Sequence, residues 1–254
     1  MLSGIRVLDL TNVLAGPFCC HQLAHMGAEV IKIEAAGRGD LARQLGADKQ
    51  LSAAQMGISF LAQNAGKKSL TLDLKSDKGK EIFCQLVQGA DVVIENFRPG
   101  VMARLGLDYP VLKELNPQLV YCAITGFGQT GPLSPRPAYD QIIQGLSGVM
   151  SITGKPDEDP LRVGFPLADT IGGLTAAMAV SAALNKRPRG QMIDVSMLDS
   201  VLTTMGWVVS NYLIGGVQPA QHGNENTTSA PSGTSTMPQP TDKTLRQVRL
   251  GQSV

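Results

Sequence analysis

The sequence has few of the features that mark secreted, membrane-spanning or nucleic-acid-binding proteins. Its four cysteines show no spacing typical of a disulfide framework, which favours a reducing compartment. It has no basic leader followed by an apolar segment and no uninterrupted apolar run of about 18 residues, so we expect neither secretion nor a membrane span. The net charge of +1 does not favour a surface for nucleic acid. These absences indicate a soluble, cytoplasmic protein.

Short apolar runs alternate with amphipathic segments along most of the chain, and 43% of the residues are hydrophobic. The short runs predict strands at 5–10, 29–34, 69–74, 91–94, 119–124 and 192–195. The amphipathic segments predict helices at 17–27, 76–89, 100–105, 140–150, after 169 and at 196–213. Ser76 and Gly89 are expected to cap the helix at 76–89. This alternation predicts an α/β fold with a doubly wound, Rossmann-like and mostly parallel sheet.

The composition changes near residue 215. Residues 218–254 are rich in Gln, Thr, Ser and Pro and show neither helical nor strand periodicity. Such composition is typical of loops and disordered segments. We therefore predict a folded domain at 1–217 and an irregular tail at 218–254.

The residues do not favour a dinucleotide or a metal ion. The turn at 12–17 has a single glycine, so it lacks the fingerprint that cradles a pyrophosphate, although Glu34 ends the second predicted strand where a ribose-binding acid would lie. His21 and His25 are spaced to share one face of a helix, but no third and fourth ligand follow at suitable spacing. We predict no metal site.

Asp169 separates an extended, Pro- and Gly-rich approach from a helix of small apolar residues. An aspartate in this place is expected to be the N-cap, and the helix dipole is expected to keep its carboxylate ionised. Gly172 and Gly173 lower helix propensity in the first turn, which indicates that something approaches the backbone closely. Two interpretations stay open on these residues: a structural cap, or a nucleophilic carboxylate in a slot lined by glycine.

Cationic and amide side chains gather where predicted strands begin or end. Asn64, Lys67 and Lys68 precede one strand, and the segment E-N-F-R-P-G at 95–100 follows another. Open α/β sheets bind ligands at the carboxyl ends of their strands. Further cations that could meet phosphates are Arg38, Lys75 and Arg104. Together these residues predict an extended anionic ligand.

The chain resembles the class III coenzyme A transferases of the CaiB/BaiF type. The similarity runs in order from residue 4 to about residue 234. Its main blocks are G-I-R-V-L-D-L-T-N-V-L-A-G-P (4–17), N-A-G-K-K-S-L-T-L-D-L-K (64–75), D-V-V-I-E-N-F-R-P-G (91–100), A-Y-D (138–140), P-L-A-D (166–169) and G-Q-M-I-D-V-S-M-L-D-S (190–200). Within this family, the sequence most resembles members that move CoA between small dicarboxylates such as succinate and glutarate.

The resemblance implies that Asp169 is the nucleophile, which attacks an acyl-CoA thioester and passes CoA to a carboxylic acid through aspartyl intermediates. Amide groups near Gly172 and Gly173 would stabilise the oxyanion. It implies coenzyme A as a substrate, no metal, and a homodimer of interlocked chains. It also implies that the CoA site is lined by Arg38, Leu72, Lys75, Asn96, Phe97, Arg98, Arg104 and Tyr139.

The resemblance also covers α-methylacyl-CoA racemases, which pair the aspartate with a histidine in a G-H-D segment. The matching segment here is A-Y-D, with Tyr139 in place of the histidine. A tyrosine with an ordinary pKa near 10 is a poor base at neutral pH, so a transferase is favoured over a racemase.

The resemblance stops after A-P-S-G-T at 230–234, where members of the family continue into a second, smaller domain. We expect a truncated chain that lacks this domain, which leads to a third hypothesis: an inactive remnant that still binds CoA.

The substitution at Tyr139 generates a test of the racemase alternative. After incubation with a 2-methylacyl-CoA in deuterated water, mass spectrometry should find no deuterium at the α carbon, because Tyr139 stands where the racemases carry the histidine base. Steady incorporation that depends on Asp169 would instead identify a racemase.

Overall fold

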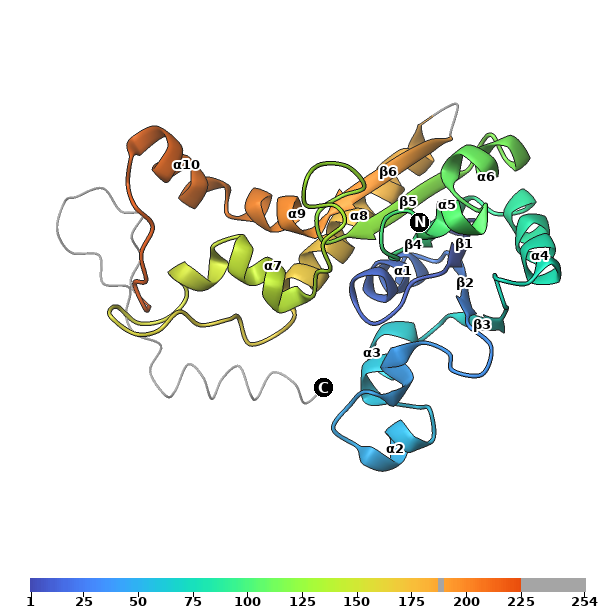
Figure 1. Ribbon diagram of the computed structural model, residues 1–254, viewed down its shortest axis with the longest axis horizontal. Coiled ribbons are helices and arrows are strands. Elements are labelled where there is room, and N and C mark those ends of the chain that lie inside the picture. The colour runs from blue at the N-terminus through green and yellow to red at the C-terminus, as the bar shows by residue number, and fades with distance from the viewer. Residues whose placement is uncertain (187–189, 225–254) are drawn as a thin grey trace.

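Six parallel strands form one sheet in the order β3-β2-β1-β4-β5-β6 (Figure 1). The computed structural model describes residues 1–186 and 190–224. The strands are β1 (Arg6–Asp9), β2 (Glu29–Glu34), β3 (Lys68–Thr71), β4 (Val92–Glu95), β5 (Val120–Thr125) and β6 (Gln191–Ser196). The order reverses between β1 and β4, the point at which doubly wound sheets open a crevice for ligands. The predicted fold class is confirmed.

The central strands are apolar because both of their faces are covered. Every residue of β4 and β5 is buried, and their sequences V-V-I-E and V-Y-C-A-I-T are nearly continuous apolar runs. The edge strand β6 instead alternates between exposed and partly buried positions over its first four residues. The first strand–helix–strand unit forms the predicted parallel pair, with Arg6 opposite Glu29.

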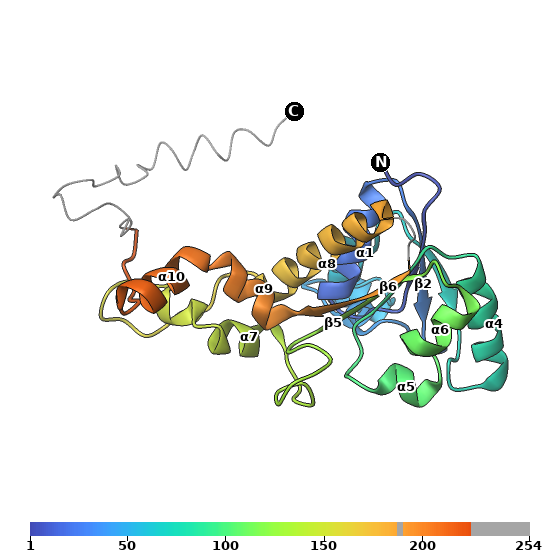
Figure 2. The ribbon, with the colours of Figure 1, turned by 90° about the horizontal axis from the view of Figure 1, so that it is seen from above.

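Helices cover both faces of the sheet and create two separate cores (Figure 2). One core lies beneath α1 and α8, and the other beneath α4, α5 and α6. The helices are α1 (Ala15–His25), η1 (Leu41–Gln44), α2 (Lys49–Ala53), α3 (Ile58–Asn64), α4 (Asp77–Gln88), α5 (Val101–Leu105), α6 (Tyr109–Leu115), α7 (Asp140–Leu146), η2 (Val149–Ile152), α8 (Leu167–Asn185), α9 (Met197–Thr204) and α10 (Gly206–Gly215).

Helix ends show where local sequence decides the structure and where it does not. Ser76 accepts a hydrogen bond from the Gly79 amide at 3.0 Å, so the predicted cap of α4 is confirmed. The single helix expected at 140–150 is wrong, because Gly148 adopts a left-handed φ of 84° and separates α7 from η2. The helix expected at 196–213 is likewise divided into α9 and α10, and α6 was not expected.

The predicted tail falls mostly outside the described residues. Residues 218–224 contain neither helix nor strand, and residues 225–254 lie beyond the part of the chain that the structure describes.

Helix α8 is the longest helix described and the most closely packed. It has 19 residues, and an 18-residue window within it has a mean hydropathy of 1.5, so by length and composition alone it could cross a membrane. It instead packs against α1, α9 and the strands β5 and β6. Gly173 allows this, since a Cβ there would lie 2.6 Å from the Ala15 carbonyl oxygen of α1. A Cβ on Gly172 would lie 2.8 Å from Met197 Cγ of α9. The predicted close approach is therefore confirmed, but neighbouring helices make it.

We predict that Gly173→Ala lowers the free energy of unfolding by about 1–3 kcal/mol, because the new methyl group meets backbone that cannot move cheaply. The matched control is Gly206→Ala at the start of α10, where a Cβ would meet no atom within 4 Å. The control should stay within about 0.5 kcal/mol of the wild type or become slightly more stable. Urea titrations of the two variants compare them, and equal stabilities would contradict the packing argument.

Candidate active site

Charged side chains are buried at the carboxyl ends of β1 and β2. Lys67 Nζ lies 2.9 Å from Asp9 Oδ2, and Lys32 Nζ lies 2.9 Å from Asp40 Oδ2. All four side chains are at most 2% exposed. Burial alone would raise the pKa of Asp9, but the charges of Lys32 and Lys67 outweigh burial and lower it. These pairs hold the loops that follow the two strands.

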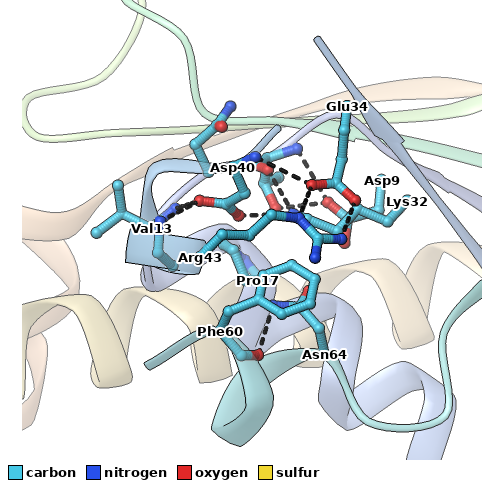
Figure 3. Close-up of polar contacts among 12 residues, drawn as sticks. Asp9, Val13, Pro17, Lys32, Glu34, Asp40, Arg43, Phe60 and Asn64 are labelled. Carbon is cyan, nitrogen blue, oxygen red and sulfur yellow. Dashed lines mark hydrogen bonds and ion pairs between the residues drawn. The ribbon is translucent and has the colours of Figure 1, made fainter. Parts of the chain in front are cut away.

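Asp40 also fixes a strained turn (Figure 3). Its Oδ1 accepts hydrogen bonds from the amides of Val13 at 3.0 Å and Ala42 at 2.9 Å. Val13 has a φ of 70°, an unfavourable value for a β-branched residue. The neighbouring Asn12 is held by Asn96, which accepts from its amide and donates to its carbonyl, both at 2.8 Å. The turn after β1 is thus clamped from two sides.

Glu34 and Arg43 form the third pair of this network, in which Glu34 is buried and the Arg43 side chain is 19% exposed. The guanidinium donates to both carboxylate oxygens at 2.7 Å and stacks 3.7 Å from the ring centre of Phe60 (Figure 3). Burial opposes ionisation of Glu34, but the bonds from Arg43 and Ser69 lower its pKa to about 2. Both oxygens of Glu34 thus accept hydrogen bonds within the protein. Glu34 therefore does not serve as the ribose-binding acid of a dinucleotide site.

A pocket of about 570 Å³ opens beside this network, at the switch point of the sheet. Four of the predicted CoA-binding residues line it together: Arg38, Leu72, Lys75 and Phe97. Arg38 and Lys75 are exposed, and neither forms an ion pair with any residue that the structure describes. The strained Val13 and its neighbour Asn12 form part of the wall.

A smaller cavity of about 140 Å³ shares Phe97 with the larger pocket. Three more predicted residues line this cavity: Asn96, Arg98 and Tyr139. Arg104 is exposed on α5 and lines neither space. The structure therefore brings seven of the eight predicted CoA-binding residues to two adjoining spaces.

Lys67, which precedes β3, and Lys68, the first residue of β3, both form ion pairs within the chain. Lys67 was expected to face an anionic ligand, but its ammonium is buried and contacts Asp9, the Pro17 carbonyl and Asn64. Lys68 pairs with Glu29 at 2.6 Å on the surface. The assignment of Lys67 is therefore wrong, because sequence spacing does not reveal that the buried Asp9 carboxylate lies opposite it. Lys68 is exposed, and its role toward an anionic ligand stays a prediction.

Asp169 lies in the first turn of α8 and is not its N-cap. Pro166 occupies the cap position, and no side chain of the helix itself caps it. The cap comes from Asp140 at the start of α7, whose Oδ1 accepts from the amides of Ala168 at 2.7 Å and Asp169 at 3.2 Å. The expected N-cap role of Asp169 is therefore wrong. The carboxylate of Asp140, which is distant in sequence, accepts from the first amides of α8, and the Asp169 side chain does not cap the helix.

The electrostatics of Asp169 also differ from the expectation. Desolvation by burial and, second, the charge of Asp140 raise the pKa of Asp169 to about 7. The prediction that the helix dipole keeps this carboxylate ionised is wrong near neutral pH, since burial and a neighbouring carboxylate outweigh the dipole. A carboxylate with such a pKa is typical of functional sites.

Gln144 fixes the position of Asp140 and of the approach to α8. This fully buried side chain donates to Asp140 Oδ2 at 2.6 Å and accepts from the Val163 amide at 2.8 Å. Sequence reasoning missed both Asp140 and Gln144. Their spacing of four residues predicts that the two side chains meet on one face of a helix. It does not predict that α8 begins beside them.

The glycines of α8 do not form an oxyanion site. Gly172 and Gly173 lie inside the helix, where each amide is engaged by the carbonyl four residues earlier. The amides of Ala168 and Asp169 at the helix start are taken by Asp140. The slot lined by glycine that was considered from sequence is thus filled by α1 and α9.

His21 and His25 contact each other at the surface of α1, with 2.9 Å between their Nε2 atoms, and His21 Nδ1 lies 3.3 Å from the Ala65 carbonyl. Within residues 1–186 and 190–224, no group of three or more His, Cys, Asp or Glu side chains could hold a metal ion.

The sequence matches the description "CoA-transferase family III" over residues 2–237. The chain belongs to this family. It is 45% identical over 236 residues to the succinate–glutarate CoA-transferase of Agrobacterium fabrum, with 91% of this chain and 59% of that protein covered. It is 44% identical over 233 residues to the acetyl-CoA:oxalate CoA-transferase of Acetobacter aceti, with 90% of this chain and 59% of that protein covered.

A solved structure carries the same fold. The crystal structure of a CAIB/BAIF family protein from Brucella suis superimposes with a TM-score of 0.82 at 40% identity, covering 90% of this chain and 61% of that one. The family III chain described here thus spans about three fifths of the length of these relatives.

The environment of Asp169 generates a stability prediction. The unfolded carboxyl ionises near its ordinary pKa of 3.8 and the folded one near 7, so the contribution of Asp169 to stability falls as pH rises between these values. Asp169→Asn removes this contribution. Because the side chain is partly open to solvent, we expect the variant to gain on the order of 2 kcal/mol over the wild type between pH 4 and pH 8.

Urea titrations of both proteins across this pH range measure the difference. A difference that stays constant with pH would show that Asp169 titrates normally.

Proposed function

We propose that this protein transfers coenzyme A from an acyl-CoA thioester, such as succinyl-CoA, to a small carboxylic acid, with Asp169 as the nucleophile. The observation that carries the proposal is the placement of Asp169: a carboxylate freed from capping by Asp140, partly buried, with a pKa of about 7. Membership of CoA-transferase family III and the names of the relatives support the reaction type.

The chemistry follows from a carboxylate that is both nucleophile and acyl carrier. An oxygen of Asp169 attacks the thioester carbonyl, the C–S bond breaks, and an aspartyl–acyl anhydride and a CoA thiolate form. The thiolate attacks the aspartyl carbonyl, which releases the donor acid and leaves CoA on Asp169 as a thioester. The acceptor carboxylate then attacks the carbonyl carbon of this thioester, which releases the CoA thiolate and forms an anhydride between Asp169 and the acceptor. The thiolate attacks the acceptor carbonyl of this anhydride, which forms the acceptor acyl-CoA and regenerates the Asp169 carboxylate.

The two adjoining spaces suit the two halves of CoA. Arg38 and Lys75 in the larger pocket provide unpaired cations for the phosphates of the nucleotide. Phe97 lies between the pockets, and Tyr139 in the smaller cavity is followed directly by Asp140, which contacts the Asp169 amide. The pantetheine arm would therefore pass through the smaller cavity toward Asp169. Arg104 on the neighbouring surface would meet the phosphates from outside.

The acceptor and the assembly also belong to the proposal. Relatives named for glutarate and oxalate suggest a small dicarboxylate as acceptor. We propose a cytoplasmic homodimer that uses no metal and acts on neither nucleic acid nor membrane.

The test is covalent capture of CoA on Asp169. The protein is incubated with succinyl-CoA, digested, and examined by mass spectrometry for a CoA thioester on the peptide that contains Asp169. Asp169→Asn should lower adduct and turnover by several orders of magnitude, because the amide cannot form the anhydride. Asp159→Asn, an exposed aspartate on the approach to α8, is the matched control and should keep the adduct.

The rate of adduct formation should also rise with pH and reach half its maximum near pH 7, as Asp169 ionises. Transfer by the Asp169→Asn variant would refute the nucleophile. Tight CoA binding without any adduct in the wild type would favour the CoA-binding remnant instead.

A further inference from the structure

Gln144 is a fully buried amide between α7 and the approach to α8, and its hydrogen bonds determine which way its side chain points. Its Oε1 accepts from the Val163 amide at 2.8 Å, and its Nε2 donates to the Phe165 carbonyl at 3.4 Å. A backbone N–H only donates and a backbone carbonyl only accepts, so this orientation is the one that satisfies both. The NH2 group of Gln144 therefore also faces Asp140, and it donates to Oδ2 at 2.6 Å.

Asp140 consequently meets a donor at each of its carboxyl oxygens. Oδ1 accepts from the amides of Ala168 at 2.7 Å and Asp169 at 3.2 Å, and Oδ2 accepts from Gln144. A proton on either oxygen would compete with an N–H group that already donates to it. The start of α8 also favours a negative charge. The hydrogen bonds thus keep Asp140 ionised, and a proton held by the pair of aspartates belongs on Asp169.

The pair is isolated from the other titratable groups around it. Among the described residues, Asp140 is the only charged group that shifts the pKa of Asp169, in addition to burial. The elements packed against α7 and α8 also carry Cys19, Cys20, His21 and His25 on α1, Tyr121 and Cys122 on β5, Asp194 on β6 and Asp199 on α9. None of these side chains contributes to the shift of the Asp169 pKa.

We propose that Gln144 is a positioning residue that keeps the proton of the Asp140–Asp169 pair on Asp169, because it donates to the Asp140 oxygen that the helix amides leave open. Without this donor, the buried Oδ2 would lack a partner, and Asp140 would hold the proton in part of the molecules. Asp169 would then be ionised in that part at a lower pH. The placement of the proton is a property of the free protein, whereas its effect on CoA transfer rests on the proposed function.

Two variants separate the donor from the space that Gln144 fills. Gln144→Met keeps an unbranched side chain and removes the donor. Gln144→Glu replaces the donor only while the introduced carboxyl is protonated, since an ionised carboxylate only accepts. The matched control is Thr170→Val in the same first turn of α8. It removes the hydrogen bond from Thr170 Oγ1 to the Pro166 carbonyl at 2.8 Å, which involves neither Gln144 nor Asp140.

The first measurement follows the protonation of Asp169 without any ligand. NMR spectra of protein with 13C-labelled aspartate carboxyl groups are recorded against pH, and the Asp169 signal is identified by its loss in Asp169→Asn. We expect the wild type and Thr170→Val to titrate near pH 7. In Gln144→Met, the ionised fraction of Asp169 at about pH 5.5 should rise about threefold, because Asp140 can then take the proton. An unchanged titration in this variant would overturn the proposal.

The second measurement is the rate of CoA adduct formation from succinyl-CoA against pH, and it decides the question through Gln144→Glu even where Gln144→Met does not fold. We expect Gln144→Glu to react like the wild type while the introduced carboxyl is protonated. At alkaline pH its rate should fall about tenfold, because three carboxylates then meet without a donor between them. The wild type and Thr170→Val should show no such fall.

A Gln144→Glu variant whose rate stays level at alkaline pH would contradict the role of Gln144 and leave the proposed function standing. A wild type that titrates near pH 7 and forms no adduct would overturn the proposed function and leave the placement of the proton standing.

Discussion

Three ion pairs at the carboxyl ends of β1 and β2, two of them fully buried, are the interaction on which the edge that lines the larger pocket depends. Asp9 with Lys67, Lys32 with Asp40, and Glu34 with Arg43 tie these strands to the segments that follow them. Removing one partner of such a pair leaves an uncompensated buried charge, which commonly destabilises a protein by about 3–5 kcal/mol. The pairs therefore specify a single arrangement, in which Asp40 holds Val13 at an unfavourable φ and the turn forms a wall of the larger pocket.

A second constraint operates at the start of α8. Close packing on α1 leaves room only for glycine at position 173, so contacts with α1 fix the position of α8. Asp140 then satisfies the first amides, and Gln144 holds both Asp140 and the approach at Val163. Capping from another helix leaves the Asp169 side chain without a capping role in a turn that Asp140 and Gln144 hold in place.

The sequence was informative where structure is local and uninformative where partners are distant. The strands, the first crossover and the Ser76 cap followed from periodicity and local chemistry. Asp140 caps a helix that begins 27 residues later, and Lys67 meets Asp9 across 58 residues, so no local pattern could identify either contact. Asp169 was found through its family, whereas its pKa depends on burial and on Asp140, which only the fold supplies.

Under the proposed function, the pairing of Asp140 with Asp169 gives a physical reason for a carboxylate nucleophile at this position. A solvated carboxylate is stabilised by water and is a weak nucleophile, whereas burial and a neighbouring negative charge make ionised Asp169 higher in free energy. Acylation converts this charge into a neutral anhydride or thioester, so the repulsion from Asp140 is relieved as the bond forms. The interaction that raises the pKa to about 7 therefore also favours acylation of the ionised fraction, which is substantial at neutral pH. Asp140, engaged by two helix amides and by Gln144, is the fixed member of the pair, and Asp169 is the proposed nucleophile.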